Sequence, residues 1–145
     1  MTSEKLNDVL FYVLEKSIKC YRQFAQRNIS REGIDITIDQ WLILKTLQER
    51  PDAPQQEIGA VIFKDYASVT RIIETLVTKG YLTRSIHMED RRRFALTITG
   101  AGINAIKCLQ PVIIGNRKLA LEGISKEELA AFTLILNKII SNCNP

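Results

Sequence analysis

The spacing of apolar and polar residues predicts helices along most of the chain, interrupted by one hairpin. The first helix runs from Ser3 to about Arg27, because apolar residues recur there at helical intervals with no internal Gly or Pro. Residues 9–14 are all apolar and cover well over half of the helix circumference, more than the single stripe that a surface helix needs. Such a helix is either fully buried, or it faces its own domain on one side and a second subunit on the other, and a chain of 145 residues favours the second arrangement.

Three shorter helices are expected next. Residues 37–40 have the form of a capping box, and the helix that they open ends before Pro51. A short helix over residues 55–63 follows, and Asp65 caps a fourth helix. The buried face of the fourth helix repeats at i, i+3, i+4 and i+7, and it comprises Val69, Ile72, Ile73 and Leu76.

Gly80 is expected to end the fourth helix in the left-handed conformation, and after it the apolar pattern alternates residue by residue. Two strands bounding residues 86–92 therefore form a hairpin with a charged loop. Thr99 caps a fifth helix, and residues 125–128 form a second capping box that opens a sixth. The sixth helix is expected to turn one apolar face inward, namely Leu129, Phe132, Leu136, Ile139 and Ile140. These elements predict a mainly α fold with a small two- or three-stranded β-wing, built as a winged helix-turn-helix core between N- and C-terminal helices.

The composition is that of a globular protein, with 46% hydrophobic and 25% charged residues, and the length fits a single domain over residues 1–145. The longest apolar run falls far short of the roughly 20 residues that span a bilayer, and no secretory signal is expected. We therefore expect a cytoplasmic protein with no membrane contact. Cys20, Cys108 and Cys143 do not form a disulfide framework, and they are expected to pack within or between helices rather than to act in redox chemistry.

Residues for catalysis are scarce. The only histidine is His87, which falls in the hairpin loop, so a nucleophilic triad is not expected. One His and three scattered Cys do not supply the ligands of a zinc site, and there is no phosphate-binding loop or dinucleotide fingerprint. The sequence predicts a protein that is not an enzyme and has no metal and no cofactor.

Positive charge is concentrated in one stretch. The chain has a net charge of +4, and residues 64–93 hold seven basic against four acidic side chains. The polar face of the fourth helix carries Ser68, Thr70 and Arg71. Short side chains let a helix about 10–12 Å across enter a major groove about 12 Å wide, and an arginine can form paired hydrogen bonds with guanine or a phosphate. The alternative is a helix face that is merely solvated.

The hairpin loop carries Arg91, Arg92 and Arg93 in succession. Strand alternation predicts that Arg91 and Arg93 face one way and Arg92 the other, with Glu89 and Asp90 as the ion-pair partners. An arginine at such a tip can enter a minor groove, where the negative potential is strong. A turn that serves only solubility, which is the alternative, would more usually mix Lys, Glu, Gly and Asn.

Residues 37–102 resemble the MarR family of winged-helix regulators. The resemblance lies in Ala67-Ser68-Val69-Thr70-Arg71 and in Asp90-Arg91-Arg92, followed at the family's spacing by Ile98-Thr99 and Gly102. It implies a winged lobe over residues 37–99 and a dimer joined by helices within residues 3–30 and 103–142. It further implies that the fourth helix enters the major groove, that Arg92 enters the minor groove, and that Asp90 orients the wing through an ion pair.

The resemblance also implies a small-molecule effector. The peroxide-sensing branch of the family has a reactive Cys near the position of Leu10, and the metal-sensing branch needs a His-rich cluster, so this chain resembles neither. The remaining branch resembles sensors of small aromatic or phenolic ligands, which bind between the dimerisation helices and the winged lobe. Tyr12, Tyr21 and Trp41 are expected to line that pocket, or else to belong to the core.

The sequence thus predicts a homodimeric transcriptional regulator that binds double-stranded DNA at a palindromic operator and acts as a repressor. The rival hypothesis is a winged helix that serves as a protein-interaction module. Such a module would expose aromatic residues on the outer face of the fourth helix, where Tyr66 is the one residue of that kind.

Overall fold

The computed structural model describes residues 3–144, which form six α-helices, one 3-10 turn and a two-stranded antiparallel sheet. The elements in chain order are η1 (Leu6–Asp8), α1 (Leu10–Arg31), α2 (Ile38–Glu49), α3 (Gln55–Ile62), α4 (Tyr66–Thr78), β1 (Leu82–Ile86), β2 (Phe94–Ile98), α5 (Gly100–Ala120) and α6 (Lys126–Cys143). The mainly α fold with a small β-wing is therefore confirmed, and the wing has two strands.

Local capping chemistry begins four of the helices where the sequence predicts. The side chain of Thr37 accepts the N–H of Gln40 while the Gln40 side chain accepts the N–H of Thr37, which completes the first capping box. The side chains of Asp65 and Thr99 accept the N–H of Ser68 and of Gly102 and so cap α4 and α5, and a second capping box, formed by Ser125 and Glu128, opens α6. Gly80 follows α4 with φ of 83°, as expected for a residue that ends a helix in the left-handed conformation.

The first helix differs from the prediction at both ends. It begins at Leu10 and not at Ser3, because residues 6–8 form a 3-10 turn and Val9 is extended, with φ −83° and ψ 115°. Asn7 and Asp8 lie in that turn, and both residue types favour turns over helix interiors. The helix continues to Arg31, four residues beyond the expected end, where Ile29 is buried in the core.

The core of the winged lobe lies between α2, α3, α4 and the hairpin. Its fully buried side chains come from each of these helices, for example Leu44, Ile58 and Val69. α5 joins the same core through Leu109. A Cβ on Gly102, at the start of α5, would overlap the backbone oxygen of Tyr81, so only glycine permits the close approach between α5 and the start of the wing.

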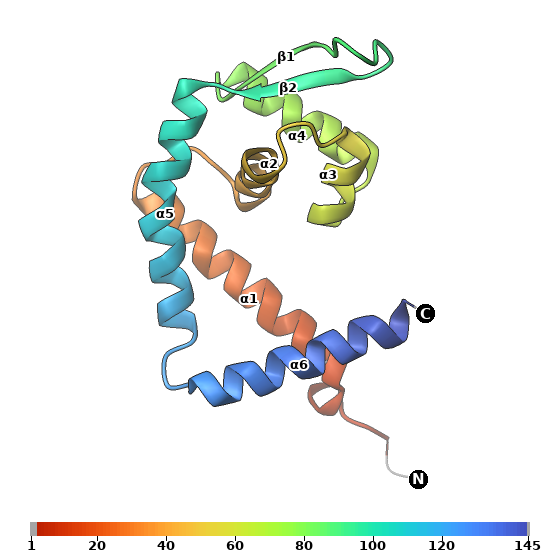
Figure 1. Ribbon diagram of the computed structural model, residues 1–145. Helices are drawn as coiled ribbons and strands as arrows, with labels where there is room; N and C mark the ends of the chain where they lie inside the picture. The colour runs from red at the N-terminus through yellow and green to blue at the C-terminus, as the bar shows by residue number, and fades with distance from the viewer. Residues whose placement is uncertain (1–2, 145) are drawn as a thin grey trace.

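The helices at the two ends of the chain leave the lobe and carry an uncovered apolar surface. In the view of Figure 1, α6 passes across the first half of α1, at the end of the molecule opposite the hairpin, and the two helices make few contacts. Of the twenty large apolar side chains that residues 3–144 expose, thirteen lie within residues 6–18 and 114–140. The predicted inward face of α6 is wrong for a single chain: Phe132 and Ile140 are exposed, and residues 3–144 bury no residue of α6.

The cysteines also differ from expectation, since Cys20, Cys108 and Cys143 are all exposed in the single chain and not packed within it. They lie on α1, α5 and α6 respectively. Within residues 3–144, no helix is long and apolar enough to cross a membrane.

Candidate nucleic-acid interface

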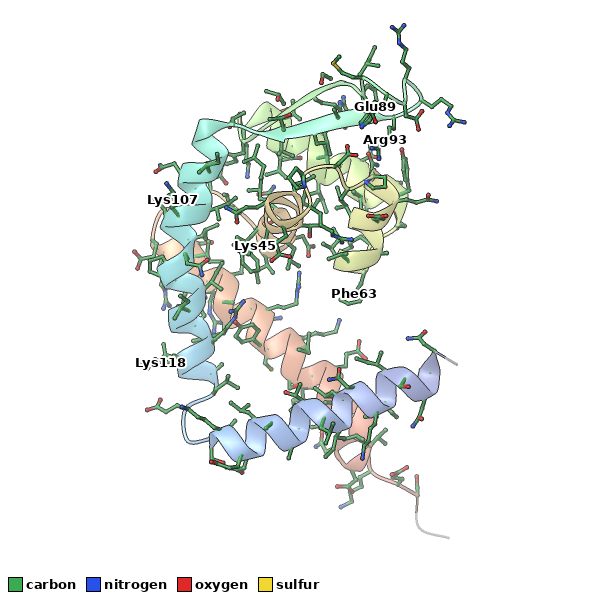
Figure 2. The ribbon with its side chains drawn as sticks, in the orientation of Figure 1. Lys45, Phe63, Glu89, Arg93, Lys107 and Lys118 are labelled. Atoms are coloured by element: carbon green, nitrogen blue, oxygen red, sulfur yellow. The ribbon has the colours of Figure 1, made fainter. Side chains whose placement is uncertain are left out.

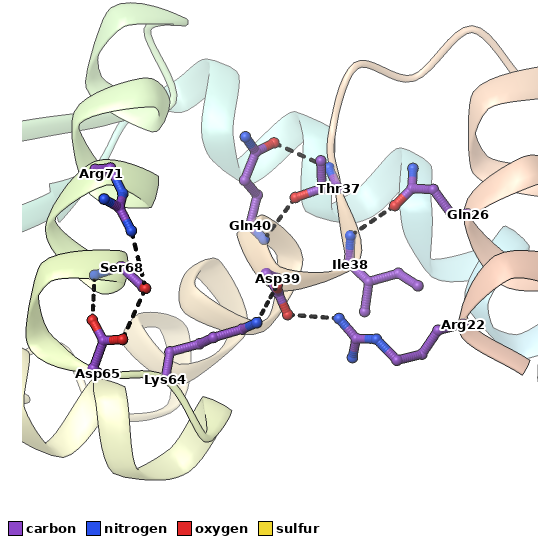
Figure 3. A network of polar contacts seen from close by, with 10 residues as sticks. All are labelled: Arg22, Gln26, Thr37, Ile38, Asp39, Gln40, Lys64, Asp65, Ser68 and Arg71. Carbon is purple, nitrogen blue, oxygen red and sulfur yellow. Dashed lines mark hydrogen bonds and ion pairs between the residues drawn. The ribbon is translucent and has the colours of Figure 1, made fainter. Parts of the chain in front are cut away.

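The first turn of α4 holds a chain of hydrogen bonds that ends in a guanidinium group (Figure 3). Asp65 Oδ1 accepts the N–H of Ser68 at 2.7 Å, and Asp65 Oδ2 accepts the Ser68 hydroxyl at 3.2 Å. Arg71 Nη2 donates to Ser68 Oγ at 3.3 Å. The backbone hydrogen bond from Ser68 holds the pKa of Asp65 below its usual range, so the cap is ionised at neutral pH. The outer face of α4 therefore presents Arg71 with most of its N–H donors unused.

Thr70 lies toward α3 and not on the outermost face of α4. Its hydroxyl donates to the backbone oxygen of Tyr66 at 2.9 Å and accepts a hydrogen bond from Gln55 at the start of α3. The hydroxyl thus ties the two helices of the helix-turn-helix together. Arg71 and Thr75 are exposed on the same helix, whereas Ser68 and Thr70 are half-buried.

Polar contacts from α1 and α2 position both ends of α4. Asp39 of α2 accepts from Arg22 of α1 at 2.7 Å and lies 3.7 Å from Lys64, which directly precedes the cap of α4 (Figure 3). At the other end, Lys79 Nζ donates to Asp35 Oδ1 at 3.1 Å and to Gln40 Oε1 at 3.2 Å. The carboxylate of Asp39 therefore connects the start of α4 to α1.

The loop of the wing holds Arg91 and Arg92 outward. Asp90 Oδ1 accepts both the N–H and the Nε of Arg92, each at 3.1 Å, and these bonds hold the pKa of Asp90 below its usual range. The Arg92 side chain is nevertheless 92% exposed. Arg91 is exposed and has no hydrogen-bond partner among residues 3–144. These two guanidinium groups are free to meet a polyanion.

Arg93 has a different position. Its Nη2 donates to Asp52 Oδ1, in the turn between α2 and α3, at 3.0 Å, and its side chain is only 28% exposed. Figure 2 shows Arg93 between the hairpin and α3. The predicted pairing with Glu89 or Asp90 is therefore wrong for Arg93, and the strand alternation does not apply because β2 begins only at Phe94.

The sequence did not indicate that Asp52 and His87 belong to the contact that holds Arg93. His87 Nε2 lies 2.9 Å from the same Asp52 oxygen that accepts from Arg93. On the outer part of the sheet, Arg84 stacks over the Phe94 ring at 4.8 Å from its centroid. Strand register pairs Arg84 with Leu96, so Phe94 is its diagonal neighbour, a relation that the alternation of the two strands can reveal. Nothing local in the sequence indicates the role of Asp52.

A cavity of about 430 Å³ lies between α1, α2 and α5. Tyr21 and Trp41 line it, together with the basic side chains of Arg22 and Arg117. Tyr12 does not line this cavity and borders a separate hollow on the outer side of α1. Within residues 3–144, no group of three or more His, Cys, Asp or Glu residues is placed to hold a metal ion.

The chain is similar to known proteins over this lobe and beyond it. The MarR family model matches residues 36–94. A putative transcriptional regulatory protein for the hcr operon of Thauera aromatica is 25% identical over 72% of this chain, and the match covers 61% of that relative's length. The HTH-type transcriptional regulator SarZ of Staphylococcus haemolyticus is 24% identical over 97% of this chain and 90% of its own.

Two solved structures share the fold. A mutant MarR of E. coli complexed with operator DNA has a TM-score of 0.84 at 21% identity, covering 94% of this chain and 99% of its own. Bordetella bronchiseptica BpsR, whose DNA binding is regulated by 6-hydroxynicotinic acid, has a TM-score of 0.85 at 20% identity, covering 95% and 97%. The winged helix with flanking helices is thus an architecture that also occurs in a DNA-bound structure.

Proposed function

We propose that this chain is a member of the MarR family of winged-helix DNA-binding transcriptional regulators, and that it acts as a homodimeric repressor and not as an enzyme. In this proposal each subunit contacts double-stranded DNA through α4 and the wing. A small aromatic or phenolic effector, bound between α1, α2 and α5, releases the dimer from its operator.

The observation that supports the DNA contact is that three arginines with mostly unused donors lie on α4 and on the loop of the wing. Arg71 on α4 uses one of its guanidinium donors for Ser68, and Arg91 and Arg92 extend from the wing loop with their donors largely free. α4 packs against β1, so the two elements meet one duplex from the same lobe. We propose that Ser68, Thr70 and Arg71 lie at the major groove, and that Asp90 orients Arg92 toward the minor groove beside it.

The uncovered apolar surface of the end helices supports a homodimer. Leu10 and Phe11 of α1 and Phe132 and Ile135 of α6 are each about half exposed. Monomeric proteins rarely leave large contiguous groups of apolar side chains exposed to water. In our proposal, residues 3–30 and 103–142 of two copies cover one another about a two-fold axis. The two α4 helices then reach half-sites about 34 Å apart, which predicts an operator with an imperfect palindrome.

The cavity supports regulation by a ligand. Its volume of about 430 Å³ suits one small aromatic molecule, and Trp41 supplies an indole whose Nε1 is buried without a partner among residues 3–144. Arg22 lines the cavity and also donates to Asp39, which lies 3.7 Å from Lys64 at the start of α4. A ligand that draws Arg22 away from Asp39 would change how α4 is held, which is the kind of two-state linkage that release requires.

Selection of bound duplexes from a random DNA pool tests the proposal. Enrichment of an imperfect palindrome is expected, and the Arg71→Ala variant should enrich a less specific set, because it loses a donor that can reach a base edge. A protein-interaction module would enrich no sequence, and its association with DNA would depend only weakly on salt. That outcome would overturn the DNA contact, while a non-palindromic motif would overturn the dimeric arrangement.

A further inference from the structure

The distal end of the wing is attached to the turn between α2 and α3 through one carboxylate. Asp52 Oδ1 accepts from His87 Nε2 at 2.9 Å and from Arg93 Nη2 at 3.0 Å, and Arg93 Nη1 lies 3.5 Å from the Asp52 backbone oxygen. His87 and Arg93 flank the loop that carries the two free arginines, and the N–H of His87 donates to the backbone oxygen of Arg93 at 3.1 Å. Asp52 therefore holds both sides of the loop at its base.

Backbone contacts determine the tautomer of His87. Its Nδ1 accepts the N–H of Glu89 at 3.2 Å and the N–H of Asp90 at 3.0 Å, so Nδ1 carries the lone pair and the proton sits on Nε2. The Nε2–H then donates to Asp52 Oδ1. Arg93 Nη2, which lies 2.9 Å from His87 Nε2, donates to the same oxygen, so Asp52 Oδ1 accepts from two donors. A single imidazole thus closes the turn of the loop with one nitrogen and attaches that turn to Asp52 with the other.

The burial of His87 and the charge of Asp52 agree with an attachment, and the Asp52 side chain itself is 78% exposed. The His87 side chain is 12% exposed although it lies in a hairpin loop. The hydrogen bond from His87 and the charge of Arg93 hold the pKa of Asp52 below its usual range, so the acceptor is ionised at neutral pH.

A two-stranded hairpin alone is only marginally ordered in water, so its free end needs another contact to keep a fixed direction. The strand residues near the lobe are held by the core, because Leu82 is buried and pairs with Ile98. The loop lies at the far end of the arm, and the contacts with Asp52 are those that attach it to the helix-turn-helix. We propose that Asp52 is a positioning residue for DNA binding, which holds His87 and Arg93 so that Arg92 is presented to the duplex in one orientation.

This inference rests on the proposed DNA contact, and it makes a prediction against the electrostatic trend. Removing an acid from a DNA-facing lobe should by charge alone strengthen binding. We expect Asp52→Ala to weaken operator binding instead, by about five-fold, since loss of order in the loop costs about as much as one exposed ion-pair contact at the DNA. Glu57→Ala is the matched control, because Glu57 is an exposed acid of the same lobe whose one ion-pair partner among residues 3–144 is Arg50, at 3.5 Å.

A double-mutant cycle separates positioning from damage to the fold. If Asp52 acts through Arg92, the Asp52→Ala, Arg92→Ala double variant should bind no more weakly than Arg92→Ala alone, and its melting temperature should match that of the wild type. Losses that multiply in the double variant would overturn the inference, as would unchanged or tighter binding by Asp52→Ala. If Arg92→Ala itself binds normally, the wing contact of the proposed function fails as well, which is a distinct result.

Two substitutions at His87 distinguish the attachment from the turn. The amide nitrogen of His87→Gln can replace Nε2 as donor to Asp52, whereas the amide oxygen of His87→Asn can replace Nδ1 as acceptor within the loop. We expect His87→Gln to keep most of the operator affinity and His87→Asn to lose about as much as Asp52→Ala. The reverse order, measured by anisotropy titration of an operator duplex, would assign the effect to the loop turn and overturn the role of Asp52.

Discussion

Replacing Arg92 with alanine should lower both the affinity for operator DNA and the sensitivity of that affinity to salt. The Arg92 side chain is 92% exposed and uses its Nε for Asp90, which leaves the two terminal amino groups of the guanidinium free. Each neutralised phosphate contributes about 0.9 to the slope of log K against log salt on duplex DNA. A homodimer has two wings, so Arg92→Ala should reduce the slope by about 1.8 per dimer, and the affinity should fall several-fold.

The measurement is a fluorescence anisotropy titration of an operator duplex at salt concentrations between about 50 and 200 mM. Lys118→Ala is the control of equal charge, because Lys118 lies near the end of α5, far from the wing (Figure 2). Arg92→Lys should restore the slope but not the full affinity, since an ammonium group keeps the charge and loses the planar pair of donors. Equal effects of Lys118→Ala and Arg92→Ala would refute the reasoning, because they would reveal only a diffuse attraction between a basic protein and DNA.

Three further predictions concern assembly and stability. Leu10→Glu should yield monomers or insoluble protein in sedimentation experiments. Val61→Glu, which charges an exposed apolar site on α3, should leave the dimer intact. A soluble Leu10→Glu dimer would show that α1 lies outside the interface. Gly102→Ala should lower the free energy of unfolding by about 1–3 kcal/mol, because its Cβ would overlap the Tyr81 backbone. Gly100→Ala should be nearly neutral, because its Cβ meets nothing within 4 Å. Equal melting temperatures of the two variants would contradict the close approach of α5 to Tyr81. Thr37→Ala should cost about 1 kcal/mol in urea denaturation by removing half of a capping box, and an unchanged midpoint would show that the cap adds nothing.

The helix starts were predictable because their determinants lie within four residues of one another. Thr37 and Gln40, like Ser125 and Glu128, satisfy each other's backbone groups across three positions, and the structure forms both capping boxes. The same locality explains Gly80, whose backbone conformation follows from its place after a helix. The start of α1 was less predictable, because the apolar periodicity continues through Val9 although the backbone there is extended.

Long-range pairing explains what the sequence could not reveal in the candidate site. Asp52 and Arg93 are 41 residues apart, and neither the spacing nor the local composition indicates that the turn after α2 meets the loop of the wing. Thr70 was assigned to the outer face from helical periodicity, but Gln55, 15 residues earlier, binds its hydroxyl. In both cases the tertiary packing of the winged lobe places a partner beside a group that the sequence alone describes as free.

The run of three arginines shows how those partners divide one sequence signal into separate roles. Arg91 has no hydrogen-bond partner among residues 3–144, Arg92 is directed by Asp90 next to it in the loop, and Arg93 is neutralised by Asp52 from another element. Arg92 and Arg93 both face a carboxylate, but the Arg92 side chain is 92% exposed whereas that of Arg93 is 28% exposed. In our proposal the wing therefore offers Arg91 and Arg92 to the duplex, and Arg93, held by Asp52, keeps the loop in the orientation that presents Arg92. If both Arg93→Ala and Asp52→Ala lower the salt slope, although they change the net charge in opposite directions, the result would distinguish this arrangement from three equivalent contacts.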